Sequence, residues 1–125
     1  MKIIATDKAP KPGGHYSQAI VQDNLVYVAG QLPFDPETGE KVLGTIGEQT
    51  NRVLLNLEAI LNAAGTGKSN VLKTTAYVAD IDQWGEVNNA YVEFFGDHLP
   101  ARAVVPTQPL HFGFLIEIDA VAVIQ

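Results

Sequence analysis

Residues 115–124 alternate in chemistry from one position to the next, which is the period of a β-strand. One set of positions is purely apolar: Ile116, Ile118, Ala120, Ala122 and Ile124. The other set places two acids among apolar residues: Leu115, Glu117, Asp119, Val121 and Val123. The first face must be buried in a core, and the acids on the second face need partners or a chemical role.

The first third of the chain also predicts strands. Residues 2–5 are typical of a short strand at a sheet edge, and the prolines and glycines of residues 7–14 indicate a loop. Residues 16–22 and 25–31 predict two further strands. Asp23 and Asn24 between them suit a tight hairpin, in which the central residues need positive φ.

Two amphipathic helices alternate with the remaining strands. Thr45 and Glu48 form a capping-box pattern before a helix predicted over residues 46–64, and Gly65 favours its end. Its apolar stripe is Val53, Leu54, Leu57, Ile60, Leu61 and Ala64. Residues 71–78 predict a strand, and a second helix follows from Asp82, its expected N-cap, to Gly96. The stripe of that helix is Trp84, Val87, Asn88, Tyr91 and Phe95, so one amide lies on an apolar face.

This order of elements predicts an α+β fold. Residues 71–78, the second helix and a strand over residues 101–105 indicate a right-handed parallel crossover. Both helices would then cover one face of a mixed sheet. We expect the other face to show Val121 and Val123, with Val26 and Val28 of the hairpin. Exposed apolar surface of this kind predicts a homo-oligomer.

Composition narrows the class of protein. A chain of 125 residues that is 46% hydrophobic predicts one domain over residues 1–125. The formal charge of −6, with Lys and Arg scattered, is a poor footprint for binding nucleic-acid phosphates. No cysteine is present, which excludes thiol chemistry and disulfides. No apolar run is long enough for a signal peptide or a bilayer span, so a cytoplasmic protein without a membrane partner is expected.

Two other motifs predict no site. Residues 65–69, Gly-Thr-Gly-Lys-Ser, resemble the end of a phosphate-binding P-loop, but Asn62 stands where its first glycine belongs. The segment also ends a helix rather than opening one, which favours a surface turn. His15, His98 and His111 lack the spacing of metal ligands, so no metal site is predicted.

Arg102 and Glu117 are the main candidates for chemistry. In one interpretation Arg102 forms a salt bridge with Glu117 or Asp119 and stiffens the sheet. In the other, its guanidinium binds a small carboxylate ligand while Glu117 holds a water or relays a proton. Asn88 can either satisfy a backbone group in the core or face a pocket. Tyr16 can likewise be hairpin packing or part of a site.

Several motifs occur together along nearly the whole chain. They are Tyr16-Ser17-Gln18-Ala19, Gly30-Gln31, Asp35-Pro36-Glu37-Thr38-Gly39, Ala63-Ala64-Gly65, Val87-Asn88 with Tyr91, Pro100-Ala101-Arg102 and Ile116-Glu117-Ile118-Asp119-Ala120. In this order and spacing they resemble the RidA/YjgF family. This family is also called the reactive intermediate (enamine/imine) deaminase family or the liver perchloric-acid-soluble protein family.

The resemblance implies a chorismate-mutase-like fold assembled as a homotrimer with clefts between subunits. It implies a 2-iminobutanoate/2-iminopropanoate deaminase-type hydrolase, which converts 2-aminoacrylate and related enamines or imines into 2-keto acids and ammonia. By this resemblance Arg102 binds the substrate carboxylate together with the Gly30 N–H, Glu117 positions the attacking water, and Tyr16 and Asn88 line the cleft. An iminium carbon is already electrophilic, so no metal or cofactor is expected.

Some positions differ from the usual family pattern. Ala29 replaces a serine, Ala103 and Val104 replace hydroxyl and thiol residues after the arginine, and His15 replaces a proline. Residues 110–114, Leu-His-Phe-Gly-Phe, are bulkier than the usual leucine-proline segment and bear on substrate choice. Two other functions stay open: a small-carboxylate-binding regulatory module without turnover, and the endoribonuclease or translation-inhibitor activity often given to this family.

Overall fold

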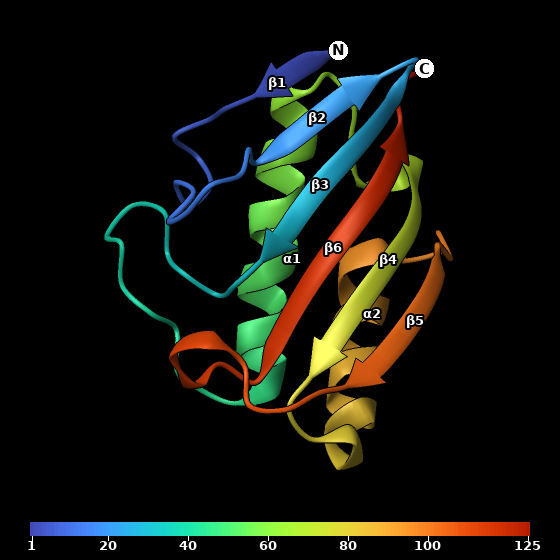
Figure 1. The fold of residues 1–125 in the computed structure, drawn as a ribbon. Coiled ribbons are helices and arrows are strands. Elements are labelled where there is room, and N and C mark those ends of the chain that lie inside the picture. The colour runs from blue at the N-terminus through green and yellow to red at the C-terminus, as the bar shows by residue number, and fades with distance from the viewer.

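The alternating apolar positions assemble one six-stranded mixed sheet with two helices on one face, as the computed structural model shows for residues 1–125 (Figure 1). Its elements are β1 (Lys2–Ile4), β2 (Ala19–Gln22), β3 (Leu25–Gln31), α1 (Ile46–Ala63), β4 (Val71–Val78), α2 (Trp84–Phe95), β5 (Ala101–Pro106) and β6 (Ile116–Val123). Short 3₁₀ turns occupy Lys68–Asn70, Ile81–Gln83 and His111–Gly113. Neither helix has the length and apolarity needed to cross a membrane. The predicted α+β class is confirmed.

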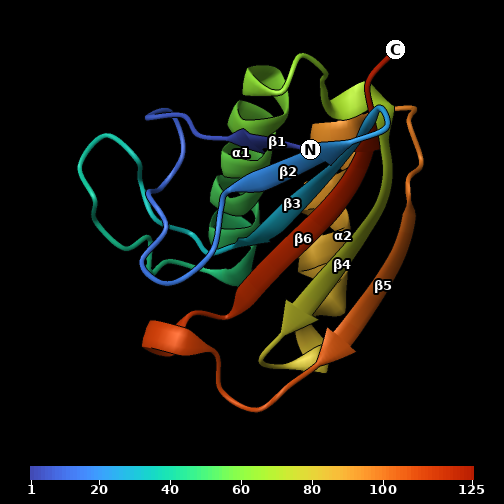
Figure 2. The ribbon, with the colours of Figure 1, turned by 45° about the horizontal axis from the view of Figure 1, so that its top comes forward.

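The strands lie in the order β1-β2-β3-β6-β4-β5, so β1 and β5 form opposite edges (Figure 2). All neighbours are antiparallel except β4 and β5, which pair in parallel and are joined through α2. The predicted parallel pair is therefore confirmed. β6 pairs with both β3 and β4, which places its two acids near the middle of the sheet.

The two faces of β6 differ as its alternation predicts. Ile116, Ile118, Ala120 and Ala122 are all buried beneath the helices. They pack in one apolar cluster with the inward stripe of α1, which includes Leu57 and Ile60. This burial explains the register of β6, because a shift by one residue would place both acids in the core.

The predicted hairpin turn and both predicted ends of α1 are supported by their backbone and cap geometry. Thr45 Oγ1 accepts a hydrogen bond from the Glu48 N–H at 3.2 Å and caps α1. Gly65 follows this helix with a φ of +90°, a left-handed conformation that suits glycine. Asp23 and Asn24 have φ values of 50° and 65°, as the hairpin requires.

Two predicted boundaries are wrong. Asp82 does not cap α2, because the Asp80 carboxylate accepts from the Asp82 N–H at 2.9 Å and caps the preceding 3₁₀ turn instead. Tyr16 precedes β2, which begins only at Ala19. The Gln18 side chain explains the later start, because its amide bonds the backbone of the N-terminal loop, including the Thr6 N–H.

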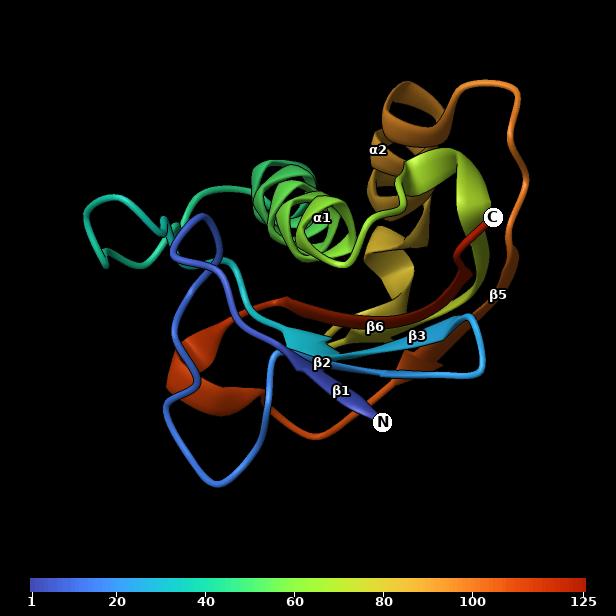
Figure 3. The same cartoon turned by 90° about the horizontal axis from the view of Figure 1, so that it is seen from above.

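The predicted exposure of Val26 and Val28 is also wrong. These residues pair with Ala122 and Ala120 and are buried on the helix side of the sheet. Both helices lie on one side of the sheet, and we call the opposite side the bare face (Figure 3). It carries the other residues of β3 and the acid-bearing positions of β6. Its apolar residues, all half-buried or exposed, include Leu25, Tyr27, Tyr77, Val105, Val121 and Val123. The expectation for Val121 and Val123 is confirmed.

Candidate functional site

Arg102 lies on the edge strand β5 and faces α2. It pairs with Thr74 of β4, which is buried on the helix side. Its Nη2 donates to Asn88 Oδ1 at 3.0 Å. The guanidinium also lies over the rings of Tyr91 and Trp84, with its carbon 4.6 and 5.3 Å from their centroids. Contacts of this kind hold the planar fork in one orientation without neutralising its charge.

The helix stripe that holds Arg102 is anchored in the core. The Tyr91 hydroxyl and Thr74 Oγ1 share a buried hydrogen bond of 2.8 Å. Burial raises the pKa of Tyr91, so this phenol stays neutral beside the cation. Asn88 and Arg102 line a hollow of 330 Å³ together with Pro100 and Leu99. Asn88 therefore faces a cavity and accepts a hydrogen bond from Arg102. Of its two interpretations, the structure supports the pocket rather than a backbone partner in the core.

Glu117 and Gly30 meet on the bare face of the sheet. Between the pairs Val28–Ala120 and Gln31–Ile118, β3 has two residues where β6 has only Asp119, which is a β-bulge. The bulge brings the Gly30 backbone against Glu117. A Cβ at residue 30 would clash with Glu117 Oε2 and would lie 3.1 Å from its Cδ. A side chain at residue 30 would therefore displace this carboxyl group from its present position.

The surroundings of Glu117 favour its protonated form. Burial raises the pKa of this carboxyl above its ordinary value of 4.5, and the nearby charge of Asp119 raises it further. His111 acts in the opposite direction and lowers the pKa. A raised pKa makes the carboxylate a stronger base, which suits a group that accepts a proton and later returns it.

Arg102 and Glu117 do not contact each other within one chain. Arg102 shares the helix face with Thr74, whereas Glu117 pairs with Tyr77 on the bare face. The chain contains one salt bridge, between Lys68 and Glu58. The interpretation of Arg102 as an internal ion-pair partner of Glu117 or Asp119 is therefore wrong.

A second cavity lies beside Gly30. Three loops meet at this end of the sheet: residues 7–18, residues 32–44 and the turn before β6 (Figures 1 and 2). They enclose a hollow of 520 Å³ that Tyr16, Gly30, Phe34, His111 and Phe112 help to line. Tyr16 is 53% exposed, and its hydroxyl accepts from the Gly13 N–H at 3.2 Å. Tyr16 therefore faces the cavity and is not buried in hairpin packing.

The five predicted site residues thus form two groups. Arg102 and Asn88 lie at one hollow, and Gly30, Tyr16 and Glu117 lie at or beside the other. Sequence reasoning gave no role to Trp84 as a partner of Arg102 or to Thr74 as the anchor of Tyr91. The spacing of Trp84, Asn88 and Tyr91 on one helix face was the available signal for the first of these.

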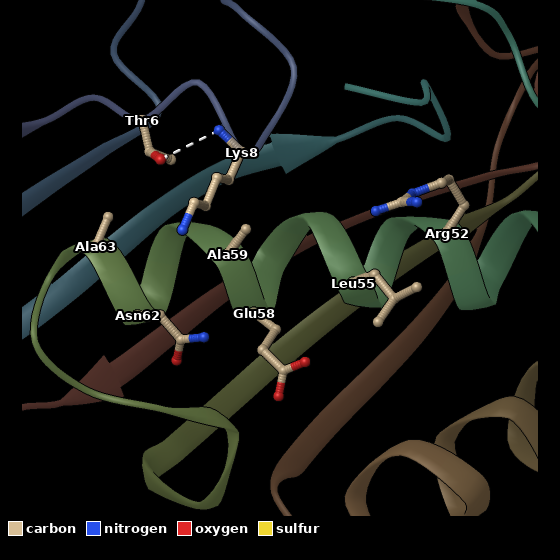
Figure 4. Close-up of a pocket in the computed structure, with 8 residues that line it drawn as sticks. All are labelled: Thr6, Lys8, Arg52, Leu55, Glu58, Ala59, Asn62 and Ala63. Carbon is tan, nitrogen blue, oxygen red and sulfur yellow. Dashed lines mark hydrogen bonds between the residues drawn. The ribbon is translucent and has the colours of Figure 1, made fainter. Parts of the chain in front are cut away.

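A further hollow, of 460 Å³, lies between the N-terminal segment and the outer side of α1 (Figure 4). Lys8 reaches toward the helix from above, while Glu58 points away from it. Glu58 is the salt-bridge partner of Lys68, at 3.9 Å, and Arg52 Nε donates to Asn56 Oδ1. The charged groups here do not converge on one point, and none of the predicted site residues is present.

Comparison with protein families shows the family of this chain. The family model described as Endoribonuclease L-PSP matches residues 6–124. The chain belongs to the RidA/YjgF family. The match covers all six strands but the first, and both helices.

Relatives of this RidA/YjgF chain have different names. It is 49% identical to a RutC family protein of Pyrococcus abyssi, over 97% of this chain and 95% of the relative. It is 46% identical to the 2-iminobutanoate/2-iminopropanoate deaminase of Rattus norvegicus, over 98% and 89% of the two chains. A crystal structure from Thermotoga maritima, provisionally described as an endoribonuclease, has a TM-score of 0.96 at 49% identity and covers 100% and 98%.

Proposed function

We propose that this protein hydrolyses 2-imino acids, and their enamine tautomers, to 2-keto acids and ammonia. The observation that carries the proposal is the separation of Arg102 from Glu117 on opposite faces of the sheet. Each group has a cavity beside it and lacks an oppositely charged partner in its own chain. The two halves become one site when a second copy brings its Arg102 to the Glu117 of the first.

The bare apolar face of the sheet supports such an assembly. Apolar surface over β3, β4, β5 and β6 favours association with further copies, and we propose the homotrimer with clefts between subunits. Arg102 is on the edge strand, where a neighbouring copy can reach it. An interface that closes over the site also excludes water, which strengthens the attraction between a guanidinium and a carboxylate.

Recognition in this cleft depends on the substrate carboxylate. The Arg102 fork can donate two parallel hydrogen bonds to it, which fixes its orientation as well as its position. Asn88 leaves part of the guanidinium free, because only Nη2 donates to it. The Gly30 N–H supplies a further donor from the other side of the cleft, and Tyr16 lines the same cavity.

The reaction needs a water molecule and one carboxyl group. Water adds to C2 of the iminium, and the Glu117 carboxylate accepts the proton that this water loses. The resulting tetrahedral carbon holds a hydroxyl and an amino group. Glu117 returns the proton to the amino group, and the C–N bond breaks as the hydroxyl oxygen forms the keto group. The hydroxyl proton passes to the Glu117 carboxylate and then to the departing ammonia, which leaves as ammonium and restores the carboxylate. The raised pKa of Glu117 suits these transfers.

Mixing two inactive variants tests this proposal. Arg102→Ala and Glu117→Ala are each expected to lose imine hydrolysis, measured with imines generated in place by D-amino acid oxidase and trapped by semicarbazide. If Arg102 and Glu117 of one site come from different copies, co-assembled variants contain some intact sites. A ring-shaped trimer formed from equal amounts would recover about a quarter of the wild-type rate.

A matched control uses two variants from the same half of the site. Arg102→Ala mixed with Asn88→Ala removes groups that lie 3.0 Å apart, so the mixture should recover nothing beyond the activity of the Asn88 variant. No recovery in the Arg102 and Glu117 mixture would contradict a shared site. No hydrolysis of any imine by the wild type would contradict the activity itself.

Binding without turnover and RNA cleavage are the competing functions. The description of the matching family model favours testing the second. The chain has 14 acids against 8 Lys and Arg residues, which opposes tight binding of a polyanion. RNA cleavage that survives purification and is lost in Arg102→Ala would support a ribonuclease. Tight keto-acid binding by a wild type that leaves imines unchanged would support the binding module.

A further inference from the structure

The cavity beside Gly30 has an aromatic wall. Phe34 and Phe112 meet edge to face with ring centroids 5.5 Å apart at an angle of 78°. Both rings also contact Phe114, at 5.1 and 6.0 Å, and Phe114 is only 1% exposed. The buried Phe114 thus anchors Phe34 and Phe112 to the interior of the protein. Such a triad is rigid, and its outer rings can offer an edge or a face to a third aromatic group.

Phe112 remains accessible although it is a large apolar residue. It is 47% exposed while lining the cavity. The His111 ring stacks on it, with centroids 3.7 Å apart and an angle of 18°, and Lys41 Nζ lies 4.9 Å from its centroid. The Phe112 ring is therefore held by its neighbours while about half of the residue stays exposed. An exposed and fixed aromatic ring in a cavity is available for contact with a ligand.

The backbone at Phe112 is unusual. Its φ of 60° and ψ of 15° lie in the left-handed region, which a bulky residue rarely adopts. Such a conformation costs free energy in a bulky residue, and strained residues of this kind cluster at functional sites. Here it turns the Phe112 ring toward Phe34 instead of away from the cavity.

The cavity also has the size and position of a side-chain pocket. Gly30 is in its lining, and Glu117 lies against Gly30, so the proposed reacting carbon is at one end. Leu32 and Phe34 continue the lining from Gly30 along the same segment, and Phe112 faces Phe34. A volume of 520 Å³ is within the range of sites for ligands larger than a three-carbon acid.

We propose that the wall of Phe34 and Phe112 binds the side chain of an aromatic 2-imino acid, so that the imine derived from phenylalanine is preferred to the imine derived from alanine. This inference rests on the proposed hydrolysis and names its substrate class. The phenyl ring leaves water for contacts with Phe34 and Phe112, and transfer of such a group is worth roughly tenfold or more in specificity. His111 keeps the Phe112 ring in place by stacking on it.

Two substitutions at residue 112 separate the ring from the backbone. Phe112→Asn removes the ring and keeps a residue that tolerates the left-handed conformation. Phe112→Tyr keeps the ring. D-Amino acid oxidase generates the two achiral imines from D-phenylalanine and D-alanine, and kcat/KM is measured for each by competition with semicarbazide.

The wild type and Phe112→Tyr are expected to favour the phenylalanine-derived imine by roughly tenfold or more. Phe112→Asn should lose this preference while its rate with the alanine-derived imine stays within about twofold. Equal rates for both imines in the wild type, or an equal loss for both in Phe112→Asn, would overturn the inference and leave the hydrolysis standing.

Calorimetric titration with phenylpyruvate and pyruvate gives a reading that does not depend on turnover. Phenylpyruvate should bind at least about tenfold tighter, and Phe112→Asn should remove the difference. A wild type that binds phenylpyruvate in this way but hydrolyses neither imine would overturn the proposed function and retain the aromatic pocket. Equal binding of the two acids would overturn the pocket.

Discussion

The Glu117 carboxyl group occupies the space in which a side chain at residue 30 would lie. A bulge in β3 opposite Asp119 brings the Gly30 backbone to this position. The Glu117 side chain can therefore take this position only because Gly30, on the neighbouring strand β3, has no Cβ. The missing side chain of Gly30 and the bulge in β3 therefore set the position of the Glu117 carboxyl group.

Gly30→Ala should displace the Glu117 carboxyl group and slow hydrolysis. The added Cβ would clash with Oε2 and lie 3.1 Å from Cδ, so the side chain must rotate. A misplacement of about 1 Å can reduce the rate by about 10²-fold. Steady-state kinetics measure the loss, with Gly13→Ala as the control because a Cβ at Gly13 meets nothing within 4 Å. Full activity in Gly30→Ala would show that the position of Glu117 is unimportant.

Glu117→Gln should separate activity from stability. The pKa of Glu117 is raised in the folded chain by burial and by Asp119, so its charged form destabilises the fold. This cost is fully present above the folded pKa and disappears as the pH falls below the ordinary value of 4.5. The variant should have a higher Tm than the wild type at pH values above the folded pKa of Glu117, a gap that closes in acid, and kcat lower by about 10²–10⁴-fold.

The acidic limb of the pH–rate profile gives a second check on Glu117. Asp119→Asn removes a charge that raises the pKa of Glu117, so the pH at which kcat/KM falls should move downward. His111→Asn removes an effect that lowers this pKa and should move the limb upward. Limbs that do not move in either variant would exclude Glu117 as the titrating group.

Arg102→Lys should weaken substrate binding although the charge is kept. An ammonium group is a point charge and cannot form the two parallel hydrogen bonds of a guanidinium, nor stack on Tyr91 in the same way. We expect kcat/KM to fall by roughly 10- to 100-fold, mainly through KM. Asn88→Ala keeps the guanidinium and should cost less. A lysine variant as active as the wild type would refute bidentate recognition.

Tyr91→Phe should affect stability more than activity. It removes the hydroxyl that shares a 2.8 Å hydrogen bond with the buried Thr74, which leaves one polar group without a partner. The expected cost is about 1–3 kcal/mol in the free energy of unfolding. Because the ring beneath Arg102 is kept, KM should change little, whereas Tyr91→Leu should raise it. Chemical denaturation and kinetics on both variants provide the measurements.

Val121→Lys should dissociate the proposed trimer. Val121 lies on the bare face between Tyr27 and Lys73, so the new cation would face the interface beside an existing one. Analytical ultracentrifugation should give three copies for the wild type and one for the variant, with loss of hydrolysis in the monomer. A wild type that sediments as a monomer, yet hydrolyses imines, would contradict the shared site.

Local signals predicted most of the secondary structure. The limits of β3 and β4 agree with the predicted residues, and Thr45 caps α1 as its capping-box pattern indicates. These features depend on interactions within a few residues, which the sequence records directly. The prediction of Asp82 as an N-cap was wrong because a second aspartate, Asp80, lies two residues earlier. Which of the two caps a helical turn depends on the path of the chain after β4.

Which face of a strand is buried was harder to predict. In β6 the alternation alone predicts which face is buried, because one set of positions is purely apolar. In β3 both sets are apolar, with Val26 and Val28 on one side and Leu25 and Tyr27 on the other. Only the pairing with β6 placed the valines under the helices.

The sequence by itself determined the strand and helix order and predicted Arg102 and Glu117 as candidates for chemistry, since residue types and short-range patterns suffice for both predictions. Only the tertiary structure decided that these two groups point to opposite sides of the sheet and that Phe112 turns into the cavity beside Gly30. The reason is physical. The side to which a residue points depends on strand register and on a bulge, and both arise from contacts between segments distant in the chain.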